Sequence, residues 1–126
     1  MDKRPVLGLD FVGVISDYPE FFEILSNLWT GKVVVISYFD SKEELEYHLR
    51  QFNIRYDKAI AVPHNTSKAK IIEDENVDYY FDDSFSNHND LTSKVGSFLV
   101  RGDGNFDFGK QLWRIDSKWR DNSNDN

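Results

Sequence analysis

The chain has 126 residues, of which 40% are hydrophobic and 15% aromatic, so it carries enough apolar material for the core of one globular domain. Its 22 acidic residues outnumber 15 lysines and arginines, and the resulting net charge of −7 repels a phosphate backbone, which argues against duplex nucleic acid as a partner. Cysteine is absent, which excludes disulfides and thiolate metal sites.

No apolar stretch approaches the roughly 20 residues that span a bilayer. The apolar run 6–9 is interrupted by Asp10 before it reaches the length of a signal-peptide core. We therefore expect a soluble, cytoplasmic protein without a membrane partner. We expect residues 1–120 to form a single domain, and the stretch 121–126, which holds only Asp, Asn and Ser, to be a disordered polar tail.

The first elements in the chain are a strand and a helix. The run 6–9 predicts a short buried strand that ends on the carboxylate of Asp10, followed by an irregular connection. Asp17 and Glu20 have the spacing of a capping box, which predicts a helix from about Asp17 to Gly31. Its apolar face at helical period consists of Phe21, Phe22, Leu25 and Leu28 or Trp29.

The next strand is predicted by the β-branched run Val33–Ile36, which is typical of parallel strands buried on both faces and ends on Ser37. Ser41 and Glu44 form a second capping-box pattern and predict a helix. The remaining predicted elements are a strand at 58–62, a helix over about 66–75, a strand at 78–81, a short helix at 87–94 and a strand at 97–101.

Strands that alternate with helices of about ten residues favour an α/β fold. We expect a Rossmann-like, doubly wound sheet of about five parallel strands with flanking helices and right-handed crossovers. In such open sheets the ligand site lies beyond the carboxyl ends of the strands, so the residues that end the strands are the candidates for function.

Polar residues end three of the predicted strands. Asp10 ends the first, Ser37 the second, and Asp82 with Asp83 the fourth, while Lys68 lies near the start of the third helix. Each has an ordinary structural explanation when taken alone, as a strand end, cap, turn or solvated charge. Their occurrence in this order at successive strand ends favours one shared site.

The chemistry of these residues points to phosphoryl transfer. A carboxylate attacks a phosphoryl group only when the repulsion between the two anions is cancelled, and a hard divalent cation with oxygen ligands does this. Asp10, Asp82 and Asp83 would hold Mg²⁺, with Asp10 also acting as the nucleophile. Ser37 and Lys68 would bind the phosphoryl oxygens and stabilise the negative transition state.

Two other sets of residues compete for roles. Lys70 lies on the same predicted helix as Lys68, but further from the helix start that faces the strand ends, so we prefer Lys68. The histidines are too scattered in sequence for a metal-ligand signature, and we interpret them as surface or structural residues. They are His48, His64 and His88.

The segments Leu9–Val14 (Leu-Asp-Phe-Val-Gly-Val) and Tyr80–Ser84 (Tyr-Phe-Asp-Asp-Ser), with Ser37 and Lys68 between them, resemble the ordered motifs of the haloacid dehalogenase-like phosphohydrolase superfamily. The resemblance covers residues 7 to about 84. It implies a Mg²⁺-dependent phosphohydrolase that acts through an aspartyl-phosphate intermediate, with the roles given above at the matching positions.

The chain departs from this resemblance at Val12. Phosphatases of the superfamily resemble Asp-x-Asp-Gly here, and their second aspartate protonates the leaving group and then activates water. Valine does neither, and general acid–base catalysis is worth roughly 10²- to 10⁴-fold. The resemblance also makes the backbone carbonyl of Val12 a metal ligand, which no side-chain change removes.

The connections that hold cap domains in this superfamily are too short here for a cap, so we expect a capless protein with an open site. The resemblance then implies a phosphorylated small molecule, an exposed phosphate on a larger substrate, or a partner subunit that acts as the lid in a homo-oligomer. The late segment Asn105–Phe108 with Trp113 resembles the 5′-nucleotidase or deoxyribonucleotidase-like branch more weakly.

Three functions therefore compete. The first is a phosphohydrolase with slowed turnover. The second is a catalytically impaired relative that binds metal and phosphate as a regulatory or assembly module, which Val12 favours. The third, a phosphoacceptor receiver domain, also uses an acidic pair, a hydroxyl and a lysine, but its acidic pair follows the first strand, whereas here the pair follows the fourth.

Overall fold

The computed structural model describes residues 3–100, 106–107 and 112–113. The polar stretch 121–126, for which we expect disorder, lies outside these residues. Arg101, the expected end of the fifth strand, and both end residues of the segment Asn105–Phe108 also lie outside them.

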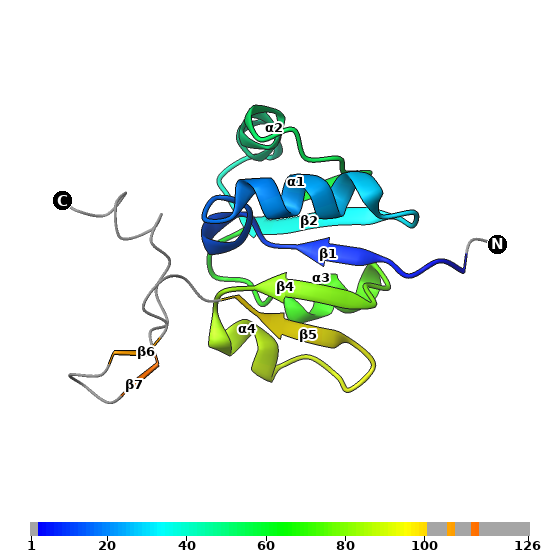
Figure 1. Ribbon diagram of the computed structural model, residues 1–126. Coiled ribbons are helices and arrows are strands. Elements are labelled where there is room, and N and C mark those ends of the chain that lie inside the picture. Colours follow the sequence, from blue (N-terminus) through cyan, green and yellow to red (C-terminus); the bar gives the residue numbers. More distant parts are fainter. Residues whose placement is uncertain (1–2, 101–105, 108–111, 114–126) are drawn as a thin grey trace.

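Five strands form one sheet in the order β3-β2-β1-β4-β5 (Figure 1). All neighbouring pairs in this sheet are parallel, which confirms the expected α/β fold with about five parallel strands. The strands are β1 Leu7–Leu9, β2 Val33–Tyr38, β3 Lys58–Val62, β4 Tyr79–Asp82 and β5 Gly96–Leu99. A separate antiparallel pair consists of β6 Phe106–Asp107 and β7 Leu112–Trp113.

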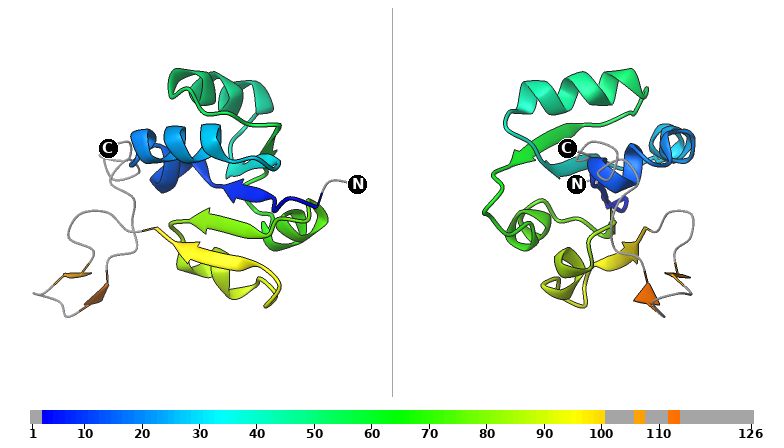
Figure 2. Two further views of the ribbon diagram at one scale, coloured as in Figure 1. Left: turned by 45° about the vertical axis from the view of Figure 1, so that its right-hand side comes forward. Right: turned by 90° about the vertical axis from the view of Figure 1, so that its left-hand side faces the viewer.

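In the described part of the chain, four α-helices cover the two faces of the sheet (Figure 2). They are α1 Pro19–Leu28, α2 Lys42–Gln51, α3 Ala69–Asp74 and α4 Phe85–Asn89. On one face, Phe22 of α1 and Leu45 of α2 pack with Leu9 of β1. On the other face, Ile72 of α3 packs with Tyr80 of β4. Each face of the sheet therefore has its own buried apolar layer.

The first helix begins later than the sequence predicts. The stretch Phe11–Ile15 forms one wide turn, closed by a hydrogen bond of 3.0 Å from the amide of Ser16 to the carbonyl of Phe11, and Val12 and Gly13 inside it have non-helical backbone angles. α1 then begins at Pro19, with Tyr18 at the N-cap position and no side-chain cap hydrogen bond. The capping box predicted at Asp17 is therefore wrong, because the wide turn precedes the helix and proline sets the first helical turn.

Two later helices also differ from their predicted bounds. The helix predicted over 66–75 is shorter, because the amide of Thr66 closes a tight turn onto the carbonyl of Pro63 at 3.0 Å. The helix predicted at 87–94 lies at 85–89 instead. Local sequence patterns located these helices, but neighbouring turns set where each one begins and ends.

α2 begins at its predicted cap. The hydroxyl of Ser41 accepts a hydrogen bond of 3.1 Å from the amide of Glu44, as the capping-box pattern predicts. Among the described residues, no helix is long and apolar enough to cross a membrane.

The strand order fixes where a ligand would bind. From β1 the chain crosses to β2 on one side, and β4 later joins β1 on the other side, so the connections diverge between β1 and β4. In open α/β sheets the crevice at this switch point, beyond the carboxyl ends of the strands, is the usual binding site. Asp10 follows β1 and Asp82 ends β4, so both lie at this point.

Candidate functional site

The structure brings the predicted site residues together at the carboxyl edge of the sheet, towards which the strand arrows point in Figure 1. All five polar side chains are buried, with exposed fractions between 0% and 4%. They are Asp10, Ser37, Lys68, Asp82 and Asp83. Burial of this many polar groups requires that they satisfy one another through hydrogen bonds and opposite charge.

Three groups contact the Oδ1 atom of the Asp10 carboxylate. This atom accepts hydrogen bonds from the amide of Phe11 at 2.8 Å and from the hydroxyl of Ser37 at 2.7 Å. The ammonium of Lys68 lies 3.0 Å from the same oxygen. These contacts fix the orientation of the carboxylate at the end of β1.

Lys68 bridges the two strands that carry the carboxylates. Its Nζ atom lies 3.0 Å from Asp10 Oδ1 and 3.0 Å from Asp82 Oδ2, and it also lies 4.8 Å from the centre of the Tyr38 ring. Lys70, the alternative, is 83% exposed at its side chain and pairs with Asp74 on the helix surface. Of the two lysines, Lys68 is therefore the one in the cluster.

Asp82 has partners that the sequence analysis missed. Its Oδ2 atom accepts a hydrogen bond of 2.5 Å from the hydroxyl of Tyr80 and one of 3.1 Å from the side-chain amide of Asn87. The Nε2 atom of His88 lies 2.9 Å from the backbone carbonyl of Asp82, and its Nδ1 atom contacts the hydroxyl of Ser97. Asn87 and His88 of α4 therefore hold Asp82 in place, and Ser97 of β5 contacts His88.

The buried charges shift one another's pKa values. Burial, followed by the charge of Asp82, raises the pKa of Asp10 above its ordinary value of 3.8. Burial also opposes ionisation of Asp82, but the charge of Lys68 and the hydrogen bond from Tyr80 outweigh it and lower the pKa of Asp82. Burial alone would lower the pKa of Lys68, but the two carboxylates raise it above 10.5. Lys68 and Asp82 therefore form a charged pair, and Asp10 is the carboxylate whose ionisation is disfavoured.

The donor set suits a hard divalent cation. Asp10, Asp82 and Asp83 each offer one carboxylate oxygen, and these atoms lie within 4.8 Å of one another. Three carboxylates beside the single ammonium of Lys68 leave a net negative cluster in a buried place. Oxygen ligands and excess negative charge are what Mg²⁺ and Ca²⁺ prefer in proteins, so these three residues fit such an ion.

The absence of a side chain at Gly13 leaves space for the carboxylate of Asp83. Gly13 has a φ of 86°, a left-handed conformation, and a Cβ atom added to it would lie 2.2 Å from Oδ2 of Asp83. Any side chain at position 13 would therefore both strain the backbone and displace the carboxylate.

We therefore expect Gly13→Ala to lower the free energy of unfolding by about 2 kcal/mol. Chemical denaturation measures this loss, and a double-mutant cycle with Asp83→Ala separates its two causes. Part of the loss should disappear in the Asp83→Ala background, since the carboxylate that a methyl group would meet is absent there. Equal losses in both backgrounds would leave backbone strain as the whole cause and contradict the steric argument.

We expect Asp10→Asn to stabilise the metal-free protein by on the order of 1 kcal/mol at pH 7. Because the folded-state pKa of Asp10 is raised, the stability from this group is present below its unfolded value of 3.8 and is lost as the pH rises through the folded value. At pH 7 the wild-type chain has lost this stability, whereas asparagine stays neutral and its oxygen accepts the same hydrogen bonds. Urea denaturation in EDTA measures the difference.

The matched control is Asp82→Asn. The pKa of Asp82 is lowered in the folded protein, so its charge contributes stability above the unfolded value of 3.8, and this stability is lost as the pH falls through the folded value. Asp82→Asn is therefore expected to destabilise the protein at pH 7. If both variants change the free energy of unfolding in the same direction, the two carboxylates do not differ in the way their surroundings indicate.

Val12 brings no ionisable group to the site. It is half-buried and packs against the apolar layer under α1 and α2. His48 lies against the ring of Phe11, and His64 stacks on Tyr38, so both make aromatic contacts and neither belongs to the carboxylate cluster. The position at which the resembling phosphatases have their general acid is therefore occupied here by the apolar side chain of Val12.

The site therefore unites all of the side chains selected from the sequence, from β1, β2, β4 and the start of α3. Comparisons with family models, curated proteins and solved structures found no match for this chain. Its function must be inferred from the geometry and chemistry of the site itself.

Proposed function

We propose that this chain is a Mg²⁺-dependent phosphohydrolase domain of the haloacid dehalogenase-like type, with slow turnover because Val12 stands at the general-acid position. The observation that carries the proposal is the meeting of Asp10 with Lys68, Ser37 and the acidic pair at the switch point of the sheet. The favoured substrate is a phosphorylated small molecule or an exposed phosphate on a larger one.

In the proposed reaction an oxygen of Asp10 attacks phosphorus, the bond to the leaving oxygen breaks, and an aspartyl phosphate forms. Ser37 and Lys68 lie against Asp10 Oδ1 and would donate hydrogen bonds to the transferred phosphoryl oxygens. When bound by the three aspartates, Mg²⁺ would supply the positive charge that offsets repulsion between the carboxylate and the phosphate. Tyr80 and Asn87 would keep Asp82 in place during this step.

Proton transfer is the weak step of this mechanism. The leaving oxygen needs a proton, and the water that hydrolyses the aspartyl phosphate must lose one, but Val12 can neither give nor take a proton. Good leaving groups such as acyl or aryl phosphates depart without help, so they should react first. The competing proposal, a module that binds metal and phosphate without turnover, is favoured by the same residue.

The test is to trap the intermediate. We expect [³²P]acetyl phosphate with MgCl₂ to label the protein after acid quenching, and hydroxylamine to release the label, because an acyl phosphate is the product on Asp10. Asp10→Asn should abolish labelling, whereas Asp74→Asn, a change at an exposed carboxylate on α3, should leave it unchanged. Labelling that persists in Asp10→Asn excludes this nucleophile. No labelling in any form, combined with Mg²⁺-dependent phosphate binding, supports the binding module instead.

A further inference from the structure

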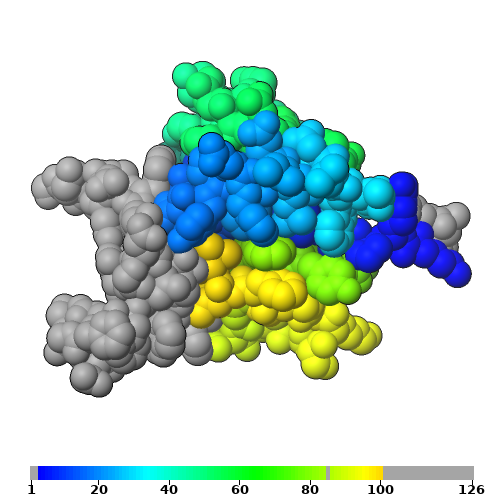
Figure 3. All heavy atoms as spheres, in the orientation of Figure 1, coloured from blue at the N-terminus to red at the C-terminus, as the bar shows by residue number. Residues whose placement is uncertain are grey.

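The ring of Tyr38, the last residue of β2, lies against the ammonium of Lys68. The Nζ atom of Lys68 is 4.8 Å from the centre of this ring, within the roughly 6 Å over which an aromatic face attracts a cation. Lys68 is the N-cap residue of α3, and Tyr38 packs on the apolar layer that α3 covers. This side of the sheet is opposite α1, which lies in front of the sheet in Figure 3. The contact therefore joins the end of a strand to the start of a helix.

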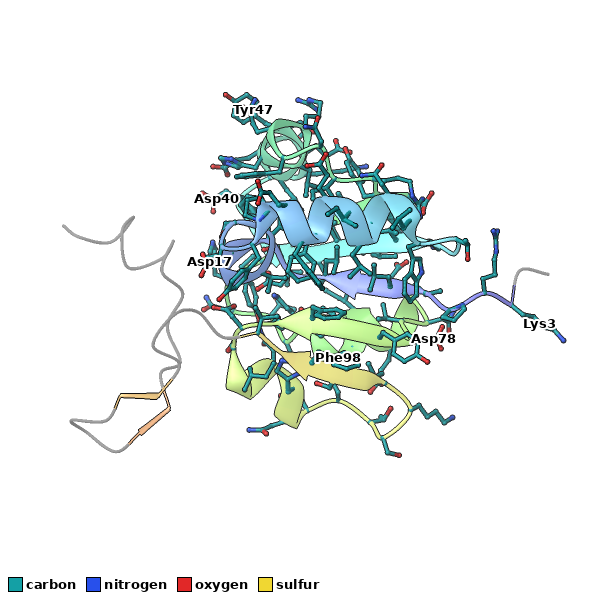
Figure 4. All side chains as sticks on the ribbon, in the orientation of Figure 1. Lys3, Asp17, Asp40, Tyr47, Asp78 and Phe98 are labelled. Atoms are coloured by element: carbon teal, nitrogen blue, oxygen red, sulfur yellow. The ribbon has the colours of Figure 1, made fainter. Side chains whose placement is uncertain are left out.

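Other contacts fix the ring of Tyr38. Its hydroxyl donates a hydrogen bond of 2.8 Å to the carbonyl of Thr66, two residues before Lys68. The ring of His64 stacks on it, with the ring centres 5.9 Å apart and an angle of 18° between the planes. Nε2 of His64 lies 3.5 Å from Oδ1 of Asp40, which Figure 4 labels at the carboxyl edge of the sheet. Burial raises the pKa of Tyr38 above its ordinary value of 10.0, so the hydroxyl keeps its proton at neutral pH. The loop between β3 and α3 thus keeps the ring beside Lys68.

The other partners of Lys68 among the described residues change when metal and substrate bind to the proposed site. They are Asp10 and Asp82, each 3.0 Å from Nζ, and the hydroxyl of Tyr80 at 3.3 Å. Asp10 would lose its negative charge on becoming an acyl phosphate, and Asp82 would share its charge with the cation. The hydroxyl of Tyr80 donates to Asp82, so its position depends on that carboxylate. Tyr38, by contrast, neither reacts nor binds the cation.

We propose that Tyr38 is a positioning residue for Lys68, and that its ring keeps the ammonium beside Asp10 while the charges around it change. This inference rests on the proposed function, because it assigns Tyr38 a part in phosphoryl transfer. Lys68 can then turn from the carboxylate of Asp10 to a phosphoryl oxygen without leaving the site. An aromatic ring attracts a cation over its whole face, so it permits such a turn, whereas a hydrogen bond prefers one direction.

Transfer of phosphate to the protein tests this role. With [³²P]acetyl phosphate and MgCl₂, we expect Tyr38→Leu to lower the labelling rate at saturating substrate by about tenfold, with a smaller effect on the half-saturating concentration. Tyr38→Phe keeps the ring and loses only the hydrogen bond to Thr66, so it should be labelled nearly as fast as the parent chain. The control is Tyr47→Leu, a change at a tyrosine that is 54% exposed on the outer side of α2 (Figure 4), and it should have no effect.

A spectroscopic measurement follows the contact itself and does not depend on turnover. In ¹H–¹³C NMR spectra of the full chain, the ε-methylene signal of Lys68 should lie upfield of the other lysine signals, because the side chain lies over an aromatic ring. The signal is identified by its absence in Lys68→Met. Tyr38→Phe should keep the upfield shift, and Tyr38→Leu should remove it. Dispersion of the remaining signals shows that each variant folds, and Tyr38→Met takes the place of Tyr38→Leu if leucine prevents folding.

The outcomes separate this proposal from the proposed function. If Tyr38→Leu is labelled as fast as the parent chain, the positioning role is wrong and the proposed function stands. Equal losses in Tyr38→Leu and Tyr38→Phe also overturn the role, because the hydrogen bond to Thr66, rather than the ring, would then hold the site. A Lys68 signal that Tyr38→Leu does not move shows that the ring does not act on the ammonium. If the parent chain is not labelled at all, the proposed function fails, and the role of Tyr38 fails with it.

Discussion

Val12→Asp is expected to raise the hydrolysis of para-nitrophenyl phosphate or a nucleoside monophosphate by about 10²-fold or more in the presence of Mg²⁺. The backbone at position 12 has φ −71° and ψ 121°, in an extended conformation that aspartate adopts without strain, and its side chain is half-buried rather than enclosed. An aspartate here would restore the group that protonates the leaving oxygen. Steady-state kinetics at saturating Mg²⁺ measure the change.

The size of the gain should depend on the leaving group. An alkyl phosphate has a poor leaving group and needs the proton most, so its gain should be the largest, whereas acetyl phosphate should gain least. Val12→Asn, which matches aspartate in size but cannot donate a proton in the same way, is the control and should produce no comparable gain. Equal gains for aspartate and asparagine would mean that polarity or packing at position 12, rather than proton transfer, limits the rate.

The double variant Val12→Asp with Asp10→Asn tests the nucleophile in the same assay. Its activity should fall to background, because the new acid has no intermediate to act on. If Val12→Asp and the parent chain are equally inert while both bind Mg²⁺, the binding-module alternative becomes the better proposal. Activity in the parent chain that survives Asp10→Asn would remove Asp10 from the mechanism altogether.

The sequence predicts the part of this site that depends on backbone order. The β-branched run Val33–Ile36 and the apolar residues before Asp10 identify parallel strands buried on both faces, and parallel strands bring their carboxyl ends to one edge. The meeting of Asp10, Ser37 and Asp82 follows from this geometry alone. Lys68 could be chosen over Lys70 only because helix starts face the same edge.

The residues that contact Asp82 could not be predicted from strand order in this way. Tyr80 reads as one more aromatic residue of a buried strand, although its spacing of two from Asp82 places both side chains on one face of β4. Asn87 and His88 follow the acidic pair on a five-residue helix, and the bounds of this helix differ from those predicted from the sequence. Their contacts depend on how α4 folds back towards β5, which is a tertiary arrangement without a local sequence signal.

Lys68→Met is expected to lower the free energy of unfolding of the metal-free protein by about 3 kcal/mol or more, since removing one partner of a buried ion pair leaves an uncompensated charge. The side chain of Lys68 is 1% exposed, and methionine keeps much of its apolar length. What disappears is the only ammonium that contacts Asp10 and Asp82 among the described residues. Urea denaturation in EDTA at pH 7 measures the loss.

Mg²⁺ should restore part of this stability. A cation bound by the three aspartates would provide the charge that Lys68 no longer supplies, and a ligand at 100 times its Kd adds about 2.7 kcal/mol. Lower pH should also reduce the loss, because protonation relieves the repulsion between the carboxylates. Lys70→Met, at the exposed lysine of the same helix, should change stability by less than about 0.5 kcal/mol. A Lys68→Met variant that Mg²⁺ does not stabilise would count against the cation site, whereas one that Mg²⁺ stabilises more than the parent chain would show that lysine and cation neutralise the same carboxylates.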